Sequence, residues 1–107
     1  MKTIKSKKEF EEVFSSGRRV NHRLVRATVL SDDEGDCASV AFVAPKRLGN
    51  AVYRNRCKRI LREAARSCGL PLPGTKIILF ATRLTHESSP AEVSSAIESI
   101  AARAGLR

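Results

Sequence analysis

The first hydrophobic pattern in the chain has the period of a helix. Three apolar side chains recur at three- and four-residue steps, which places them on one helical face: Phe10, Val13 and Phe14. Ser6 and Glu9 have the spacing of a capping box, in which the Ser oxygen accepts a helix N–H and the Glu side chain reaches back. Gly17 stands where a C′ glycine ends a helix. The pattern predicts a helix over residues 7–16.

After this helix the pattern changes to alternation. Residues 18–26 (RRVNHRLVR) alternate cationic and apolar side chains and predict the start of a strand. Alternate positions then predict two longer strands. Val25, Ala27 and Val29 share one face of the first, and Ala38, Val40, Phe42 and Ala44 share one face of the second. The acidic, glycine-containing residues 31–36 between them predict a hairpin turn. We interpret the carboxylates of this turn as solvated rather than as metal ligands.

The middle of the chain returns to helical spacing. Six apolar residues recur at three- and four-residue steps: Val52, Cys57, Ile60, Leu61, Ala64 and Cys68. Asn50, which follows a glycine, is a suitable N-cap. Gly69 and the prolines beyond it end the segment. The pattern predicts one amphipathic helix that begins after Asn50 and ends before Gly69.

The last third of the chain contains a strand and a helix. Residues 77–81 (IILFA) form a continuous apolar run, typical of a central strand covered on both faces. Residues 89–92 (SPAE) form a second capping box with proline at the first helical position. The buried face of the helix that follows comprises Val93, Ala96, Ile97, Ile100, Ala101 and Ala104. The order αβββαβα predicts an α+β fold of two layers in a single domain, residues 1–107.

Composition narrows the class of protein. A hydrophobic fraction of 42% in 107 residues indicates a folded globule rather than a disordered basic tail. The charged first twelve residues do not resemble a signal peptide, and no apolar run approaches the roughly 20 residues of a membrane span. We therefore expect a soluble, cytoplasmic protein. The three cysteines and two histidines lack metal-ligand spacing, so we interpret the cysteines as reduced, small apolar side chains and expect no zinc site.

Positive charge is concentrated in residues 46–66. This stretch holds eight cations and a single acid, Glu63, so its net charge is +7 of the +9 of the whole chain. Four of the cations step by four and form a continuous cationic ridge: Arg54, Lys58, Arg62 and Arg66. The ridge favours RNA or DNA as a partner, because each cation that displaces counterions from phosphate adds affinity. A membrane-surface helix is disfavoured, since the apolar side of this helix contains Ala and Cys rather than large side chains.

Residues 49–63 (GNAVYRNRCKRILRE) resemble the RNR signature of the bacterial ribonuclease P protein subunit, with Arg-Asn-Arg, Lys-Arg and Arg-Glu at the family's spacing. Residues 9–17 are similar to the family's aromatic first helix, and residues 77–83 to its strand ending in basic residues. The chain departs from the family at Pro45-Lys46-Arg47, where members often have two adjacent lysines, and at Ala65, where many have an aromatic residue. The resemblance implies a ribosomal-protein-like fold with a sheet of about four strands and a left-handed βαβ crossover, against the general right-handed rule.

The resemblance also implies a function. It identifies a non-catalytic subunit of the ribonucleoprotein that removes the 5′ leader from precursor tRNA. The implied partners are the ribonuclease P RNA and precursor tRNA, with no membrane and no obligate protein partner. The RNA, with Mg²⁺ bound mainly by the RNA, would carry out hydrolysis, and the protein alone would hold no cofactor. The chain itself offers no catalytic set, because His22, His86 and the scattered carboxylates lack the spacing of a nuclease site.

Two RNA-binding surfaces follow from the resemblance. The helix of the RNR signature would contact the RNA subunit through Arg54, Asn55, Arg56, Lys58, Arg59, Arg62 and Arg66. A central cleft between the first helix and the sheet would hold the leader, with Phe10, Phe14, Lys46, Arg47 and Arg83 along it. The residues alone leave two interpretations of Phe10 and Phe14, as core side chains or as stacking partners of unpaired bases.

Two other function classes are consistent with a basic helix. A structural RNA-binding protein, such as a small ribosomal protein, would carry much the same helix. A DNA-binding helix-turn-helix module is disfavoured, because the basic helix lies between strands rather than after a short helical turn.

Overall fold

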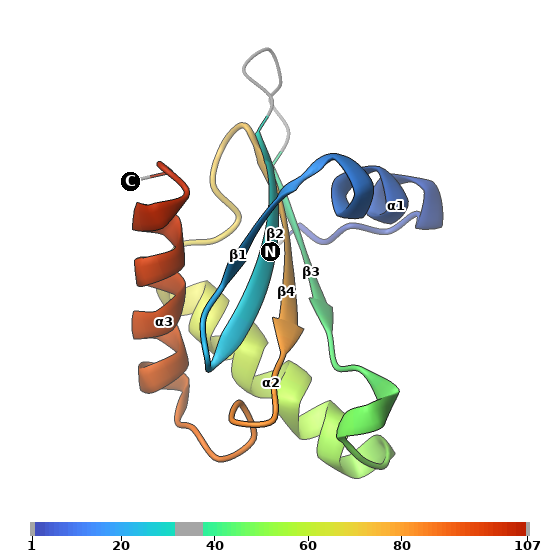
Figure 1. Ribbon diagram of the computed structural model, residues 1–107, viewed down its shortest axis with the longest axis vertical. Helices are drawn as coiled ribbons and strands as arrows, with labels where there is room; N and C mark the ends of the chain where they lie inside the picture. Colours follow the sequence, from blue (N-terminus) through green and yellow to red (C-terminus); the bar gives the residue numbers. More distant parts are fainter. Residues whose placement is uncertain (1, 32–37, 107) are drawn as a thin grey trace.

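The computed structural model describes residues 2–31 and 38–106. Within these residues the chain forms α1 (Lys7–Ser16), β1 (Arg18–Asn21), β2 (Val25–Ser31), β3 (Ala38–Val43), the 3-10 helix η1 (Lys46–Leu48), α2 (Ala51–Ser67), β4 (Thr75–Ala81) and α3 (Pro90–Arg103) (Figure 1). Apart from the short η1, this is the predicted order αβββαβα, and the helix predicted over residues 7–16 has the predicted bounds.

The strands form one mixed sheet in the order β1-β2-β4-β3. β2 pairs antiparallel with β1 and β4, whereas β3 pairs parallel with β4. The predicted hairpin between the second and third strands is therefore wrong, because β4 lies between them. The apolar run of β4 explains its place, since Ile77, Ile78 and Leu79 are all buried and need cover on both faces. Residues 32–37, which include Cys37 and most of the predicted acidic turn, lie outside the described residues.

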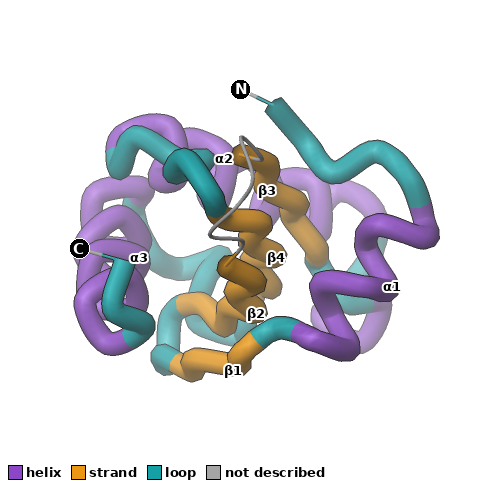
Figure 2. Tube along the Cα trace, turned by 90° about the horizontal axis from the view of Figure 1, so that it is seen from above, coloured by secondary structure: helices purple, strands orange, loops and turns teal. Residues whose placement is uncertain are grey.

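The connection from β3 through α2 to β4 has the rarer hand. The two strands are parallel, and α2 crosses back on the face of the sheet that α3 also covers (Figures 1 and 2). Seen from that face with both strands pointing up, β4 lies to the left of β3, so the crossover is left-handed. The structure follows the hand implied by the family resemblance rather than the general rule.

Helices α2 and α3 enclose the main core against one face of the sheet. Leu61 of α2, Val93 of α3 and Val40 of β3 are fully buried in it. The predicted apolar residues of the two helices are buried or half-buried, with one exception: Val52 is 79% exposed. Val52 lies in the first turn of α2, which extends past the end of the sheet (Figure 1).

The opposite face of the sheet is only partly covered. Helix α1 packs against β2 and β4 on this side (Figure 2). Its Val13 is fully buried there, and Thr28 and Ile78 are the buried residues that the two strands contribute. Helix α1 thus adds a partial third layer to the two expected layers, and the rest of this face stays open.

Ser6 caps α1 as predicted, because its Oγ accepts a hydrogen bond from the Glu9 N–H at 3.0 Å. The Glu9 side chain has a different partner from the predicted one. Its carboxylate accepts a hydrogen bond from Ser39 Oγ at 3.3 Å, so it connects α1 to β3.

Gly17 ends α1 for a steric reason and not for the conformational reason that the sequence suggested. Its φ of −75° and ψ of 159° are extended backbone that any residue adopts. A Cβ at this position would lie 2.5 Å from the Val13 carbonyl oxygen and 2.7 Å from Thr28 Cγ2. Glycine is required because the end of α1 approaches β2 so closely.

The caps of the other helices form as predicted. The Asn50 Oδ1 accepts a hydrogen bond from the Tyr53 N–H at 2.9 Å and begins α2. Ser89 and Glu92 form the reciprocal bonds of a capping box at the start of α3. The hydrogen bond from the Ser89 N–H lowers the pKa of the Glu92 carboxyl, since it stabilises the charged form.

The outer edge of β3 is paired with the start of the chain. The Ile4 N–H donates to the Val40 carbonyl at 3.0 Å, and the Val40 N–H donates to the Lys2 carbonyl at 3.1 Å. Unpaired strand edges invite association with other chains. The N-terminal segment therefore closes part of this edge.

The two described cysteines, Cys57 and Cys68, are buried thiols, as predicted for small apolar side chains. Burial raises the pKa of the Cys57 thiol, because the core disfavours a thiolate.

Candidate nucleic-acid interface

Helix α2 carries most of its cations on the side away from the core. Arg59, Arg62 and Arg66 are exposed, and Lys58 is half-buried beside them. At the rotation of a regular helix these four residues fall within about a third of its circumference. The exposed Asn55 lies on the same side, and the exposed Arg56 lies farther round the helix. The structure thus brings five of the seven predicted RNA-subunit contacts to one face.

Two cations of the cationic ridge also contact the sheet. Arg54 is half-buried, and its Nε donates a hydrogen bond to the Ala44 carbonyl at 2.9 Å. The Arg62 guanidinium lies 5.4 Å from the centroid of the Phe42 ring, within cation–π distance. Both guanidinium groups are therefore held in place by the fold itself, and Arg54 stabilises the fold as well as adding charge.

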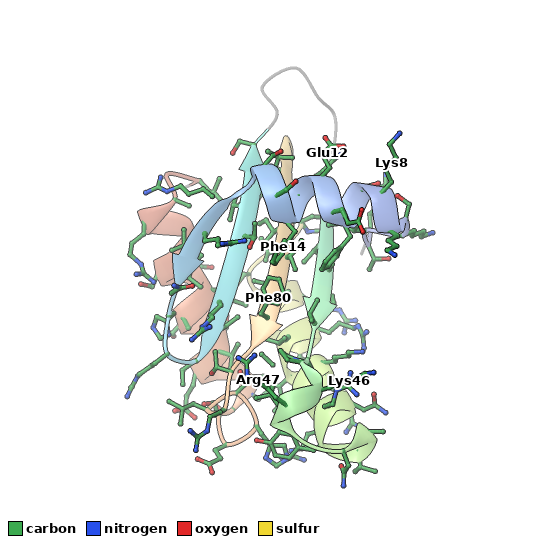
Figure 3. The ribbon with its side chains drawn as sticks, turned by 45° about the vertical axis from the view of Figure 1, so that its right-hand side comes forward. Lys8, Glu12, Phe14, Lys46, Arg47 and Phe80 are labelled. Atoms are coloured by element: carbon green, nitrogen blue, oxygen red, sulfur yellow. The ribbon has the colours of Figure 1, made fainter. Side chains whose placement is uncertain are left out.

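A groove of about 430 Å³ lies on the open part of the sheet face, next to α1 (Figure 3). It is lined by Phe14, Arg19, Asn21, Arg26, Ala27, Thr28, Val43, Pro45, Arg47, Phe80 and Ala81. These described residues include three arginines and two phenylalanines, and no aspartate or glutamate. The groove is therefore cationic and aromatic, a combination suited to a single-stranded nucleic acid.

Phe14 presents its ring to the groove. It is 40% exposed, and it meets Phe80 edge to face, with 5.9 Å between the ring centroids (Figure 3). Phe10 stacks on Phe14 at 6.3 Å with an interplanar angle of 10°. The Arg19 guanidinium lies 4.8 Å from the Phe14 centroid. Phe14 is thus held by three neighbours with part of its ring open, which is the geometry of a stacking surface rather than of a core residue.

Sequence reasoning missed two of the three arginines in the groove. Of the predicted cleft residues, Phe14 and Arg47 line it. Arg19 and Arg26 line it as well, from β1 and β2. The alternation of β1 contained the signal: Arg19 lies next to the buried Val20 and so faces the opposite side of the sheet. The pairing of β1 with β2, which the sequence did not specify in register, brings the two arginines together.

Three predicted cleft residues lie outside the lining. Phe10, Lys46 and Arg83 are all within the described ranges, yet none of them lines the groove. Phe10 supports Phe14. Lys46 is exposed on η1 next to Arg47, and Arg83 is exposed just after the end of β4.

His22 occupies the turn between β1 and β2 as a neutral side chain. Its Nδ1 accepts a hydrogen bond from the Leu24 N–H at 3.1 Å. Burial, followed by the charges of Arg103 and Arg23, lowers the pKa of the imidazole. The protonated form would lose the bond to Leu24 and meet two like charges.

The stability of the protein is expected to fall as the pH drops through about 6.5, in part because of His22. The folded pKa lies below the unfolded value of about 6.5, so the unfolded chain binds a proton more readily than the folded chain. The contribution of His22 to the stability is fully present above the unfolded pKa, and it is lost as the pH falls from there through the folded pKa. The test is urea unfolding at a series of pH values. His22→Asn, whose side-chain oxygen still accepts from the Leu24 N–H, should flatten this part of the profile. An unchanged slope would contradict the assignment.

Neither a metal site nor a membrane span is found in residues 2–31 and 38–106. No group of three or more His, Cys, Asp or Glu side chains there could hold a metal ion. No helix in these residues is long and apolar enough to cross a membrane. The absence of a catalytic set stays a prediction from the sequence.

Solved structures of proteins from two bacteria share this fold. The ribonuclease P protein of Staphylococcus aureus matches with a TM-score of 0.79 and 24% identity, covering 97% of this chain and 95% of its own. The ribonuclease P protein of Thermotoga maritima matches with a TM-score of 0.75 and 18% identity, covering 94% of this chain and 96% of its own. The agreement spans nearly the whole of each chain, so the architecture is the same throughout.

Sequence comparison connects the chain to a family. The family model described as Ribonuclease P matches residues 1–105. The ribonuclease P protein component of Symbiobacterium thermophilum is 36% identical over 104 residues, covering 96% of this chain and 90% of the relative. That of Gluconacetobacter diazotrophicus is 34% identical over 106 residues, covering 97% and 91%. The chain therefore belongs to the family of bacterial ribonuclease P proteins, the protein subunits of a tRNA-processing enzyme.

Proposed function

We propose that this protein binds the ribonuclease P RNA through α2 and the 5′ leader of precursor tRNA in its groove, while the RNA subunit hydrolyses the substrate. The observation that carries the proposal is that the protein has two separate cationic surfaces. One lies on helix α2, and the other lies in an aromatic groove on the sheet. Family membership sets aside the small ribosomal protein and the helix-turn-helix module as alternatives.

Helix α2 is suited to a structured RNA. Lys58, Arg59, Arg62 and Arg66 share one side of the helix, where they can follow a phosphate backbone. Arg54 is oriented by Ala44, directly after β3, and Arg62 by Phe42 of β3 before any RNA is bound, which lowers the entropic cost of ordering them on binding. Such contacts hold the backbone and carry no base specificity.

The groove is suited to an unpaired strand. The open part of the Phe14 ring offers a surface on which a base stacks, and every base has a π face, so the contact tolerates any leader sequence. Arg19, Arg26 and Arg47 place positive charge around that ring for the phosphates. Lys46 and Arg83, which lie outside the lining, add charge to the surrounding surface.

The proposal divides the chemistry between the two subunits. The protein residues bind and orient the RNA subunit and the substrate. Mg²⁺ prefers phosphate oxygens and carboxylates in octahedral geometry, and we assign it to the RNA, where it would supply charge stabilisation for phosphodiester hydrolysis. The proposed assembly acts on precursor tRNA in the cytoplasm and requires no further protein partner.

Leader-dependent binding tests the groove. In the presence of ribonuclease P RNA, the wild-type protein should bind precursor tRNA more tightly than mature tRNA. Phe14→Ala should weaken precursor binding by about 5- to 100-fold, the effect of losing one stacked base, and leave mature tRNA binding unchanged. Phe14→Leu is the matched control, because it keeps apolar volume without the ring. The measurement is equilibrium binding of the reconstituted holoenzyme to both tRNAs.

Two outcomes would overturn parts of the proposal. Equal affinity of the wild-type holoenzyme for precursor and mature tRNA would favour a purely structural RNA-binding protein. Cleavage of precursor tRNA by the isolated protein would place the active site in the protein instead of in the RNA.

A further inference from the structure

A third cationic surface lies where the turn between β1 and β2 meets the loop after β4. Two hydrogen bonds join these segments. The Thr82 Oγ1 donates to the Arg23 carbonyl at 2.6 Å, and the fully buried Thr85 Oγ1 donates to the Leu24 carbonyl at 2.6 Å. Arg83 follows Thr82 directly, so the fold fixes the backbone of one exposed arginine beside that of another, Arg23.

Helix α3 adds a third arginine to the same turn. The Arg103 Nη2 donates to the Asn21 carbonyl at 2.7 Å, across a sequence separation of 82 residues. His22 lies between Asn21, whose carbonyl accepts this bond, and Arg23 in the chain, so the turn places it next to both arginines. Because its Nδ1 accepts from the Leu24 N–H, its other ring nitrogen, Nε2, carries the proton and is a donor. We call His22, Arg23, Arg83 and Arg103 the turn patch.

The turn patch is continuous with the groove. Asn21, whose carbonyl receives the Arg103 bond, also lines the groove. Arg26, its partner in the register of β1 with β2, lines the groove beside it. A strand that lies in the groove and leaves it past Asn21 therefore arrives at the turn patch.

The Glu92 carboxylate of α3 lies near the patch and already accepts a hydrogen bond. The Glu92 carboxylate is close enough to Arg23 for the arginine to lower its pKa slightly, but its larger interaction is the hydrogen bond from the Ser89 N–H at 3.0 Å. Arg23, Arg83 and Arg103 are all exposed, so a phosphate can approach these three side chains from solvent. Their charges are available for phosphate.

We propose that the turn patch binds the sugar–phosphate backbone of the single-stranded leader beyond the part held in the groove. This inference rests on the proposed function of the groove. It assigns to the protein a longer footprint on its substrate than the groove alone provides. The patch would act through phosphate charge and would not distinguish leader sequences.

The experiment compares two leaders in the reconstituted holoenzyme: one of about 4 nucleotides and one of about 12, within the range of sites on single-strand-binding proteins. The wild-type protein should bind the longer leader more tightly. Arg23→Gln combined with Arg103→Gln should remove that gain, a loss of about 10-fold at about 0.1 M salt for two phosphate contacts, and leave short-leader binding unchanged. Glutamine at position 103 keeps a donor for the Asn21 carbonyl.

A matched control removes the same charge elsewhere. Lys7→Gln with Lys8→Gln, both exposed in the first turn of α1, should leave the length-dependent gain intact. Arg23→Gln alone provides a second variant that retains the Arg103 bond, and it should lose about half of the gain on a logarithmic scale.

The possible outcomes distinguish a failure of the turn patch from a failure of the groove. If the wild-type holoenzyme prefers precursor to mature tRNA but binds both leaders equally, the turn patch has no role and the groove keeps its own. If the double variant and the lysine control lose the same amount, the effect is one of net charge and the patch is excluded. If the holoenzyme shows no preference for precursor tRNA at all, the groove proposal itself fails.

Discussion

Replacing Arg59, Arg62 and Arg66 with alanine is expected to lower the affinity of the protein for ribonuclease P RNA on the order of 100-fold at about 0.1 M salt. All three side chains are exposed on one side of α2, away from the core. Each lost phosphate contact should reduce the slope of log affinity against log salt by about 0.7 to 0.9. The slope should therefore fall by about 2 to 3, and the affinities of variant and wild type should converge at high salt.

The comparison needs a control of equal charge. Lys5, Lys7 and Lys8 are exposed near the N-terminus, and their triple replacement removes the same three charges. That variant should keep most of the affinity and most of the salt slope. Arg54 is left in place, because its loss would also remove the hydrogen bond to the Ala44 carbonyl, directly after β3. The prediction is wrong if both triple variants lose affinity equally, since net charge alone would then explain binding.

Gly17→Ala is expected to destabilise the fold by about 2 to 3 kcal/mol, which is the upper part of the range for overpacking. The new methyl group would lie 2.5 Å from the Val13 carbonyl oxygen, and backbone must move to relieve that contact. Helix α1 would shift away from β2. Because α1 carries Phe14, the ring would also move relative to Phe80, so leader binding should weaken together with stability.

A substitution at Gly105 distinguishes the effect of a steric clash from the effect of backbone strain. Gly105 has a φ of +75°, and a Cβ there would meet nothing within 4 Å. Gly105→Ala should cost about 1 kcal/mol from left-handed backbone strain alone. Urea unfolding of both variants tests the difference. If Gly17→Ala is no more destabilising than Gly105→Ala, the close approach of α1 to β2 is not what requires glycine.

The sequence predicted those elements whose signals are local. Helix periodicity and capping residues located α1, α2 and α3, and the apolar run of residues 77–81 identified the central strand. The sequence did not predict that β4 lies between β2 and β3, because strand order depends on how distant segments pair. For the same reason it predicted a hairpin at residues 31–36.

The candidate site shows the same division. The cations of α2 are contiguous in the sequence and were all recognisable there. The groove, in contrast, is assembled from α1, β1, β2, β3, β4, Pro45 and η1. Arg19 and Arg26 became members of it only through the register of β1 with β2. The sequence alone is consistent with Phe14 as a core residue or as a stacking partner, and its exposure and ring contacts favour the groove.

The place of β4 at the centre of the sheet also determines when the protein can fold during synthesis. β4 is the last of the described strands to leave the ribosome, yet it joins β2 to β3 at the centre of the sheet. Before it emerges, the described strands can form only the short β1–β2 hairpin, and a two-stranded hairpin is marginally stable in water. The nascent chain must therefore expose the whole of α2 before its sheet can close. During that interval a highly cationic segment is accessible to any nearby RNA, including the ribosome itself.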